Sequence, residues 1–307
     1  MSLDKDMEGK LVKIIEERGP LTGSEIIEAL RVKPLALWRT CRQSEALEVR
    51  RIGSRYLRLD RKVEGFARLS PSILREFMTY TLVGLAGGAQ SLDLRADATT
   101  RHIREVSRAK LALALRIVEG LRSRLSKDWP SEGRICFIIA GDIVYDMAHD
   151  VPRPEQSTGE LVNGSDIDLV VVADDSVSRD FLKSLDEAIY REKYYTLISP
   201  SVREEIDYVV KDMERVKEQL LFDTFKRMVA CKILHEGRLL SGSQSIFDEI
   251  KAMLVSRGLT KRLTQMEVQA KKFRQKSEEY LLNNELAKIS RDDLNLFYTT
   301  EESEEFE

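Results

Sequence analysis

Apolar positions between residues 7 and 61 recur first with the spacing of helices and then with that of strands. Their order predicts three short helices followed by a β-hairpin that turns at Gly53-Ser54, a dipeptide suited to a two-residue turn. The expected helices cover 7–19, 21–32 and 34–47, and the expected hairpin strands cover 47–52 and 55–60.

This order of elements resembles a winged helix-turn-helix domain over residues 1–62. The segment carries 14 Lys and Arg against 10 Asp and Glu, whereas the whole chain has a formal net charge of −3. A locally basic winged domain favours contact with nucleic-acid phosphates, and DNA is the nucleic acid expected in the alternative function given below. The candidate nucleic-acid residues are Arg39, Arg42, Arg50, Arg51 and Arg55. A winged domain that makes protein contacts, with its arginines in solvent, is the open alternative.

The pattern after this segment predicts a helical connector over residues 63–104. A helix is expected over 69–85, because Ser70-Pro71 provides a cap followed by a proline in the first turn. Residues 86–100 are expected to be loose, and a long amphipathic helix is expected from about His102 to Leu125.

From residue 134 the pattern changes to short apolar runs that are typical of buried strands. The first run, Ile135–Ile139, ends in a glycine corner at Gly141, and a helix-like segment follows. Backbone N–H groups converge at such a corner and favour anions. Further strands are predicted over 165–173 and 204–210.

Two carboxylates stand one residue apart at the start of the second of these strands. Asp166 and Asp168 must project to the same face of a strand, where their charges repel each other unless a cation lies between them. Oxygen ligands of this kind suit Mg²⁺. If Asp207 lies on an adjacent strand, three carboxylates could bind two Mg²⁺ or Mn²⁺ ions. An Asp-x-Asp pair alone is more often an ordinary strand end, where an aspartate caps the strand or faces water, so the prediction depends on the combination.

The glycine corner, the Asp-x-Asp strand, the later strand aspartate and the segment "EGRLLSG" together resemble the DNA polymerase β-like nucleotidyltransferase superfamily over residues 105–255. The resemblance implies an α+β fold with a central mixed sheet. It implies transfer of a nucleoside monophosphate from an NTP such as ATP to an acceptor hydroxyl, with release of pyrophosphate. Asp166 and Asp168 would hold metal ions, and Asp207 would assist deprotonation of the acceptor. Nucleotide contacts are expected at Gly141, Asp142, Ser165 and Lys226.

Two features depart from the pattern of that superfamily. Asp142 stands where serine or glycine usually follows the corner glycine, and its carboxylate would repel a triphosphate. A polar insertion over 149–164 separates the corner from the Asp-x-Asp strand. The alternative function is therefore a winged-helix DNA-binding regulator whose nucleotidyltransferase-like domain binds a nucleotide but has lost catalysis.

Composition limits the remaining possibilities. The three cysteines are far apart and never form a C-x-x-C pair, so neither a disulfide framework nor a zinc site is expected. The apolar stretch 77–89 is too short to cross a membrane, the first residues lack the apolar core of a secretory signal, and a cytoplasmic location is expected. Residues 256–307 predict a charged helix followed by an acidic tail.

Overall fold

The computed structural model describes residues 2–155 and 158–299 of the 307-residue chain. Helices account for 57% of the structure and strands for 16%. The predicted mixture of α and β structure is therefore confirmed in this coarse form. Most of the predicted acidic tail lies outside the described residues. Within them, no helix is both long and apolar enough to span a membrane.

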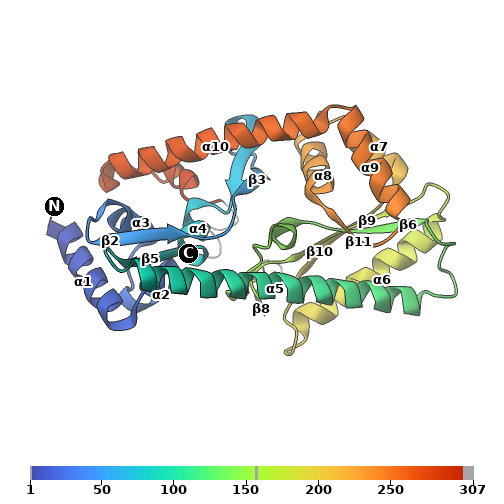
Figure 1. Cartoon of the computed structure of the whole chain (residues 1–307). Coiled ribbons are helices and arrows are strands. Elements are labelled where there is room, and N and C mark those ends of the chain that lie inside the picture. Colours follow the sequence, from blue (N-terminus) through green and yellow to red (C-terminus); the bar gives the residue numbers. More distant parts are fainter. Residues whose placement is uncertain (1, 156–157, 300–307) are drawn as a thin grey trace. The chain divides into compact units, whose positions relative to one another are not determined.

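The chain forms two units of dense internal contacts. Unit 1 comprises Met1–His102 and Met266–Glu307, and unit 2 comprises Ile103–Gln265. Two long helices, α5 (Ala89–Arg124) and α10 (Leu259–Asn283), contribute residues to both units (Figure 1). The predicted connector thus belongs almost wholly to unit 1.

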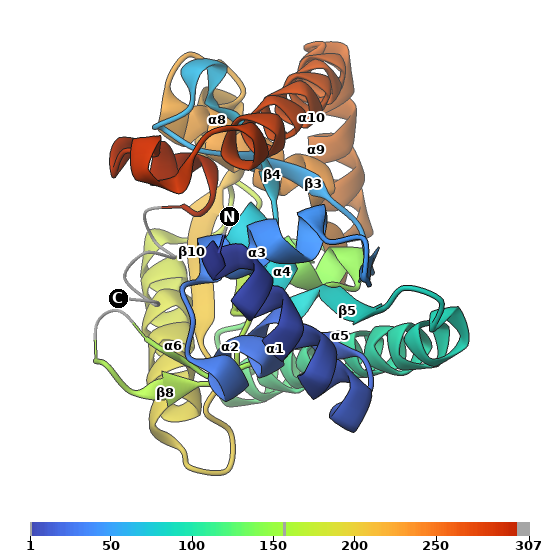
Figure 2. The same cartoon turned by 90° about the vertical axis from the view of Figure 1, so that its left-hand side faces the viewer.

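The other elements of unit 1 are α1 (Ser2–Arg18), β1 (Leu21–Thr22), α2 (Gly23–Leu30), α3 (Pro34–Gln43), β2 (Leu47–Arg51), β3 (Tyr56–Leu59), η1 (Glu64–Phe66), β4 (Ala67–Ser70), α4 (Ile73–Thr79), β5 (Thr81–Leu85), η3 (Leu286–Lys288) and η4 (Asp292–Leu296). Figure 2 shows α1, α2 and α3 grouped beside β5. Their apolar faces enclose a core that includes Leu11, Ile26, Leu37 and, from the end of the chain, Leu281 and Phe297. Burial of these side chains supplies most of the driving force for unit 1.

The predicted hairpin around Gly53-Ser54 is wrong. Both strands exist, but β2 pairs antiparallel with β5 and β3 pairs with β4, and the order of the three-stranded sheet is β1-β5-β2. The ladder continues past β2, because the N–H of Ile52 donates to the carbonyl of Tyr80 at 2.9 Å. Leu82 and Val83 of β5 are completely buried, so β2 pairs with a strand from the interior of unit 1.

The expected helix over 69–85 is also wrong, as is the expected loose segment after it. Ser72, not Ser70, caps the short helix α4 by accepting a hydrogen bond from the N–H of Arg75, and the mostly apolar run that follows becomes β5. The helix α5 begins already at Ala89. Residues 86–100 are therefore mostly helical, because Leu92 and Ala96 bury one face of the added turns.

Unit 2 contains β6 (Ile135–Ile139), η2 (Gly141–Tyr145), β7 (Arg153–Pro154), β8 (Leu161–Val162), β9 (Ile167–Ala173), α6 (Arg179–Ile198), β10 (Ile206–Asp212), α7 (Met213–Gln219), α8 (Phe225–Glu236), β11 (Arg238–Gly242) and α9 (Gln244–Ser256). Its main sheet has the order β10-β9-β6-β11, in which β9 and β10 are parallel and the other pairs are antiparallel. The predicted strands at 135–139, 165–173 and 204–210 are confirmed to within two residues.

The two faces of this sheet are covered differently. Alternate residues of β9, including Ile167 and Leu169, join α6 and the second half of α5 in one apolar core. Figure 1 shows α8 and α9 on the opposite side of the sheet from α6. Asp166 and Asp168 alternate with the core residues, so they face the side of α8.

Candidate functional site

The three predicted metal ligands come together at one end of two parallel strands. Asp166 directly precedes β9, and Asp168 is in register with Asp207 of β10. Registered residues of neighbouring strands project to the same face, with backbones about 4.8 Å apart. The condition set by the sequence, that Asp207 lie on the strand beside Asp168, is therefore met.

The crowding of carboxylates changes their ionisation. Burial, and then the negative charge of Asp207, raise the pKa of Asp166 to about 6. Burial, and then the charges of Asp166 and Asp142, raise the pKa of Asp168 well above its ordinary value. Four carboxylates therefore repel one another here, and any cation that enters will be stabilised by them.

The glycine corner fits closely against Asp168. The N–H of Ala140 donates to the carbonyl of Asp168 at 3.0 Å, and this bond closes the β6–β9 ladder beside the corner. Gly141 has a φ of +67°, and a Cβ there would lie 1.8 Å from Oδ2 of Asp168. Only glycine leaves the space that this carboxylate occupies.

The corner differs from the predicted anion site in two respects. The segment after Gly141 is a five-residue 3₁₀ helix, η2, and not an α-helix, so it offers no extended helix dipole. The N–H of Gly141 also lies 3.4 Å from Oε1 of Glu236, whose almost fully buried carboxylate accepts hydrogen bonds from Tyr145 and Lys232 at 2.7 and 2.6 Å. A side chain of α8 thus provides the anion at this corner.

Asp142 and Ser165, both predicted to contact nucleotide, contact each other. The Ser165 hydroxyl donates to Oδ2 of Asp142 at 2.7 Å and accepts from the N–H of His149 at 3.2 Å. The bond holds the carboxylate of Asp142 beside the Asp-x-Asp pair. It also gives a reason for an aspartate after the corner glycine, because a serine there would lose this charge-assisted hydrogen bond.

The insertion over 149–164 supplies a basic residue that sequence reasoning missed. Arg153 of β7 donates to the carbonyl of Gly164 at 2.8 Å and to Glu205 at 2.7 Å. Its charge lowers the pKa of Asp166 against the effects of burial and Asp207. Only one feature of the sequence indicated this role, the presence of a basic residue in the predicted surface loop. Residues 156 and 157 of the insertion lie outside the described residues.

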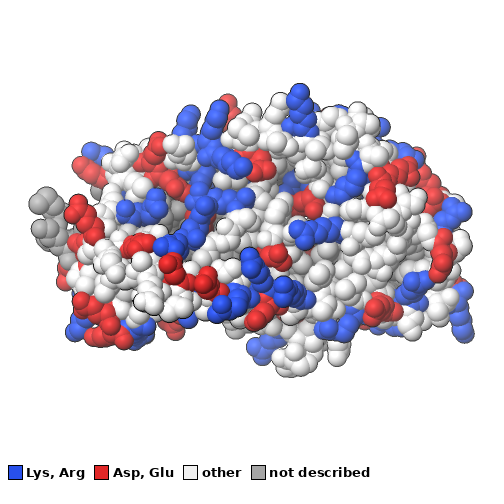
Figure 3. Space-filling view, viewed as in Figure 1, with Lys and Arg blue, Asp and Glu red and all other residues white. Residues whose placement is uncertain are grey.

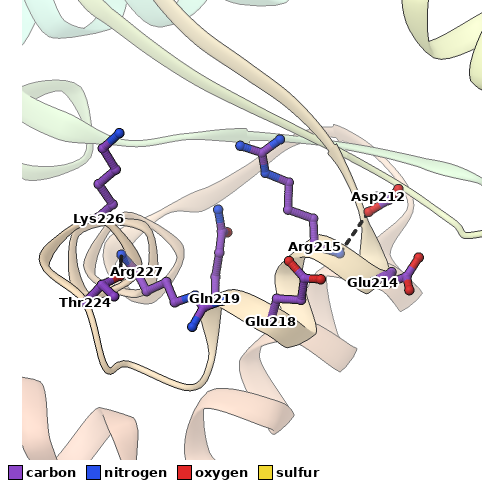
Figure 4. Close-up of a pocket in the computed structure, with 8 residues that line it drawn as sticks. All are labelled: Asp212, Glu214, Arg215, Glu218, Gln219, Thr224, Lys226 and Arg227. Carbon is purple, nitrogen blue, oxygen red and sulfur yellow. Dashed lines mark hydrogen bonds between the residues drawn. The ribbon is translucent and has the colours of Figure 1, made fainter.

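The basic residue of α8 whose charge acts on the aspartates is Lys232, not the predicted Lys226. The charge of Lys232 acts on Asp168, and its ammonium pairs with Glu236. Lys226 instead lines a pocket of about 580 Å³ between α7 and the start of α8, where its side chain projects to the same side as that of Arg215 (Figure 4). That pocket begins at Asp212, five residues along β10 from Asp207, which is roughly 16 Å at 3.3 Å per residue.

Asp207 is held by a cation of the chain itself. Its Oδ1 lies 3.0 Å from the ammonium of Lys193 on α6, and its side chain is 53% exposed. Among residues 2–155 and 158–299, no group of three or more His, Cys, Asp or Glu side chains has the arrangement of a metal site. The three cysteines are free and buried.

Most of the predicted nucleic-acid arginines make contacts within unit 1. Arg39 donates to the carbonyls of Leu281 and Asn284, Arg50 pairs with Glu48 and Asp93, and Arg55 pairs with Glu76 and Glu278. Arg51 lies 3.8 Å from Glu76, and both Arg42 and Arg51 line a cavity. Figure 3 shows acidic and basic side chains intermixed over the face that it draws. The structure thus gives the arginines 39, 50 and 55 structural partners.

Comparison with protein-family models and with curated proteins adds no relative. No protein-family model matches the chain, and no curated protein matches it significantly.

Proposed function

We propose that unit 2 is a metal-dependent nucleotidyltransferase, which transfers a nucleoside monophosphate from an NTP to an acceptor hydroxyl. The observation that carries the proposal is the set of mutually repelling carboxylates, Asp166, Asp168, Asp207 and Asp142, at one end of β9 and β10. A protein gains no stability from such crowding, and strongly perturbed carboxylates of this kind gather at functional sites.

The donors fit a hard divalent cation. Carboxylate oxygens are the ligands of Mg²⁺ and Mn²⁺. Burial, and then the charges of neighbouring carboxylates, raise the pKa values of Asp166 and Asp168, and a bound cation would offset both effects. Asp166 and Asp168 would hold the ion. A bound divalent cation would neutralise charge on the reacting phosphate.

The chain's own residues account for the remaining requirements. In the transfer, an acceptor oxygen bonds to the α-phosphorus, the bond from that phosphorus to the bridging oxygen breaks, and pyrophosphate leaves. Asp207, exposed and beside Lys193, would take the acceptor's proton. Gly141 keeps space for Asp168, and Ser165 fixes Asp142.

The test is label transfer from α-phosphate-labelled NTPs with Mn²⁺ or Mg²⁺, comparing the wild type with Asp168→Asn. We expect the variant to lose at least 100-fold in rate. Asp174→Asn is the matched control, because Asp174 directly follows the same strand but pairs with Arg134 and Ser176. Equal rates in wild type and Asp168→Asn would refute the proposal.

The carboxylate of Glu236 at the Gly141 corner favours a second candidate, a nucleotidyltransferase-like domain without turnover that serves a DNA-binding regulator. A triphosphate would have to displace Glu236 or approach from another side. Glu236→Gln should tighten NTP binding if the corner is the triphosphate site, whereas Glu249→Gln, an exposed change on α9, should not. NTP binding without pyrophosphate release would support this second candidate.

A further inference from the structure

Unit 1 holds a cavity that the proposed transferase does not use. The cavity measures about 260 Å³, slightly below the roughly 300–1,000 Å³ of pockets for drug-sized ligands. Its charged and aromatic lining comes from α3, β2 and the residues after it, α4 and α10, namely Trp38, Arg42, Arg51, Arg55, Glu76 and Glu278.

The two carboxylates of this lining are already shared between two arginines. Arg55 donates to both oxygens of Glu76 at 2.5 Å and to Glu278 at 3.0 Å. Behind them, the buried Arg274 lies 3.3 Å from Glu76 and 3.1 Å from Glu278. Arg55 and Arg274 therefore balance the charges of Glu76 and Glu278.

Two further guanidinium groups remain at the cavity. Arg51 lies 3.8 Å from Glu76, too far for a hydrogen bond, and Arg42 has no ion pair with any described residue. The cluster thus contains four arginines but only two carboxylates, an excess of two positive charges. Burial lowers the pKa of Arg274 to about 10, although the charges of Glu76 and Glu278 oppose this effect.

We propose that this cavity binds a phosphate group, with Arg42 and Arg51 as its ligands, while Arg55 stays paired with Glu76 and Glu278. Guanidinium groups present paired N–H donors that match phosphate oxygens, and the ligand's charge would offset the excess. The phosphate belongs either to a small phosphate compound or to a nucleic-acid backbone, and the two sources present the same chemistry.

The first test is calorimetric titration of the full chain with inorganic phosphate, at constant ionic strength maintained with chloride. We expect binding by the wild type and at least tenfold weaker binding by Arg42→Gln/Arg51→Gln. Arg50→Gln is the matched control, because Arg50 is the neighbour of Arg51 on β2 but pairs with Glu48 and Asp93. Binding that is absent from the wild type, or that is equal in wild type and the double variant, would overturn the proposal.

A second variant shifts affinity in the opposite direction. Glu278→Gln removes one negative charge from the lining, so phosphate should bind several-fold more tightly. Simple loss of structure cannot produce such a gain. An unchanged or weakened affinity in Glu278→Gln would contradict the electrostatic basis of the site.

The source of the phosphate is then identified by competition. A single-stranded and a duplex oligonucleotide are each titrated with the wild type and with Arg42→Gln/Arg51→Gln. Oligonucleotide binding that phosphate displaces and the double variant loses supports a nucleic-acid source. Binding of inorganic phosphate alone supports a small phosphate compound.

Discussion

Both units bury charged side chains. Unit 1 surrounds a carboxylate with arginines of opposite charge, whereas unit 2 surrounds its carboxylates with further carboxylates of the same charge. In unit 1, burial opposes ionisation of Glu76, yet hydrogen bonds from Arg55 and the charge of Arg274 hold the pKa of Glu76 below its ordinary value. In unit 2, burial and neighbouring carboxylates act in the same direction and raise the pKa values of Asp166 and Asp168.

The comparison separates a structural charge cluster from a candidate binding site. A carboxylate surrounded by arginines stabilises the folded chain once it is ionised, and its removal leaves cations buried without partners. A carboxylate surrounded by other carboxylates destabilises the folded chain and becomes favourable only when a cation binds. Substitutions in the two clusters should therefore change stability with opposite signs.

The largest effect is expected from Glu76→Gln in unit 1. The substitution leaves Arg55 and Arg274 with one carboxylate between them, and breaking a buried ion pair costs about 3–5 kcal/mol of unfolding free energy. Urea denaturation at pH 7 measures the loss. Glu279→Gln, an exposed change on α10, should stay within about 0.5 kcal/mol of wild type. A small effect from Glu76→Gln would remove the distinction between the clusters.

A smaller loss is expected from Gly141→Ala in unit 2. The new Cβ must displace the carboxylate of Asp168 and adopt a φ of +67°, at a cost of about 2 kcal/mol. Gly133→Ala has a similar φ of +83° but open space around its Cβ, so it isolates the backbone contribution of about 1 kcal/mol. Equal losses in the two variants would mean that the close approach to Asp168 is unimportant.

A gain in stability is expected from Asp168→Asn in metal-free buffer at pH 7. The amide keeps the shape of the side chain but removes one of the repelling charges. The free energy of unfolding should therefore rise by about 1 kcal/mol. Asp174→Asn, in which hydrogen bonds from Ser176 lower the pKa of the carboxylate, should give no gain. Destabilisation by Asp168→Asn would indicate that the unit 2 cluster is neutralised by the chain itself.

The smallest effect is a difference in the pH dependence of the two units. Because Asp166 has a folded pKa of about 6, above its unfolded value of about 3.9, the folded state binds more protons between these values. The contribution of Asp166 to the free energy of unfolding therefore falls as pH rises from about 4 to 6. The stabilisation contributed by Glu76 has the opposite dependence on pH. It is complete above the unfolded pKa of about 4.3, and it is lost as pH falls through the lowered pKa of the folded state.

Native-state hydrogen exchange measures this difference in each unit, once intrinsic exchange rates are corrected for pH. Between pH 7 and 5, amides of β9 in metal-free protein should become better protected, whereas those of α4 should change little. Asp166→Asn should weaken the response in β9. Loss of β9 protection on acidification would contradict the raised pKa of Asp166.

Local sequence determined the elements whose signals lie within a few residues. Apolar runs fixed β6, β9 and β10, and the Asp-x-Asp spacing placed Asp166 and Asp168 on one face, because side chains alternate along any strand. Pro34 marked the start of α3. The presence of Asp207 on a strand was likewise readable from its apolar neighbours.

Only the tertiary structure decided which distant residues meet. The strand β2 pairs with β5 and not with the adjacent β3, Glu236 reaches the Gly141 corner, and Arg153 reaches Asp166. Likewise Arg55, predicted to contact nucleic acid, lies between two glutamates. Such pairings depend on burial and charge balance summed over the folded chain, and no window of neighbouring residues contains that information.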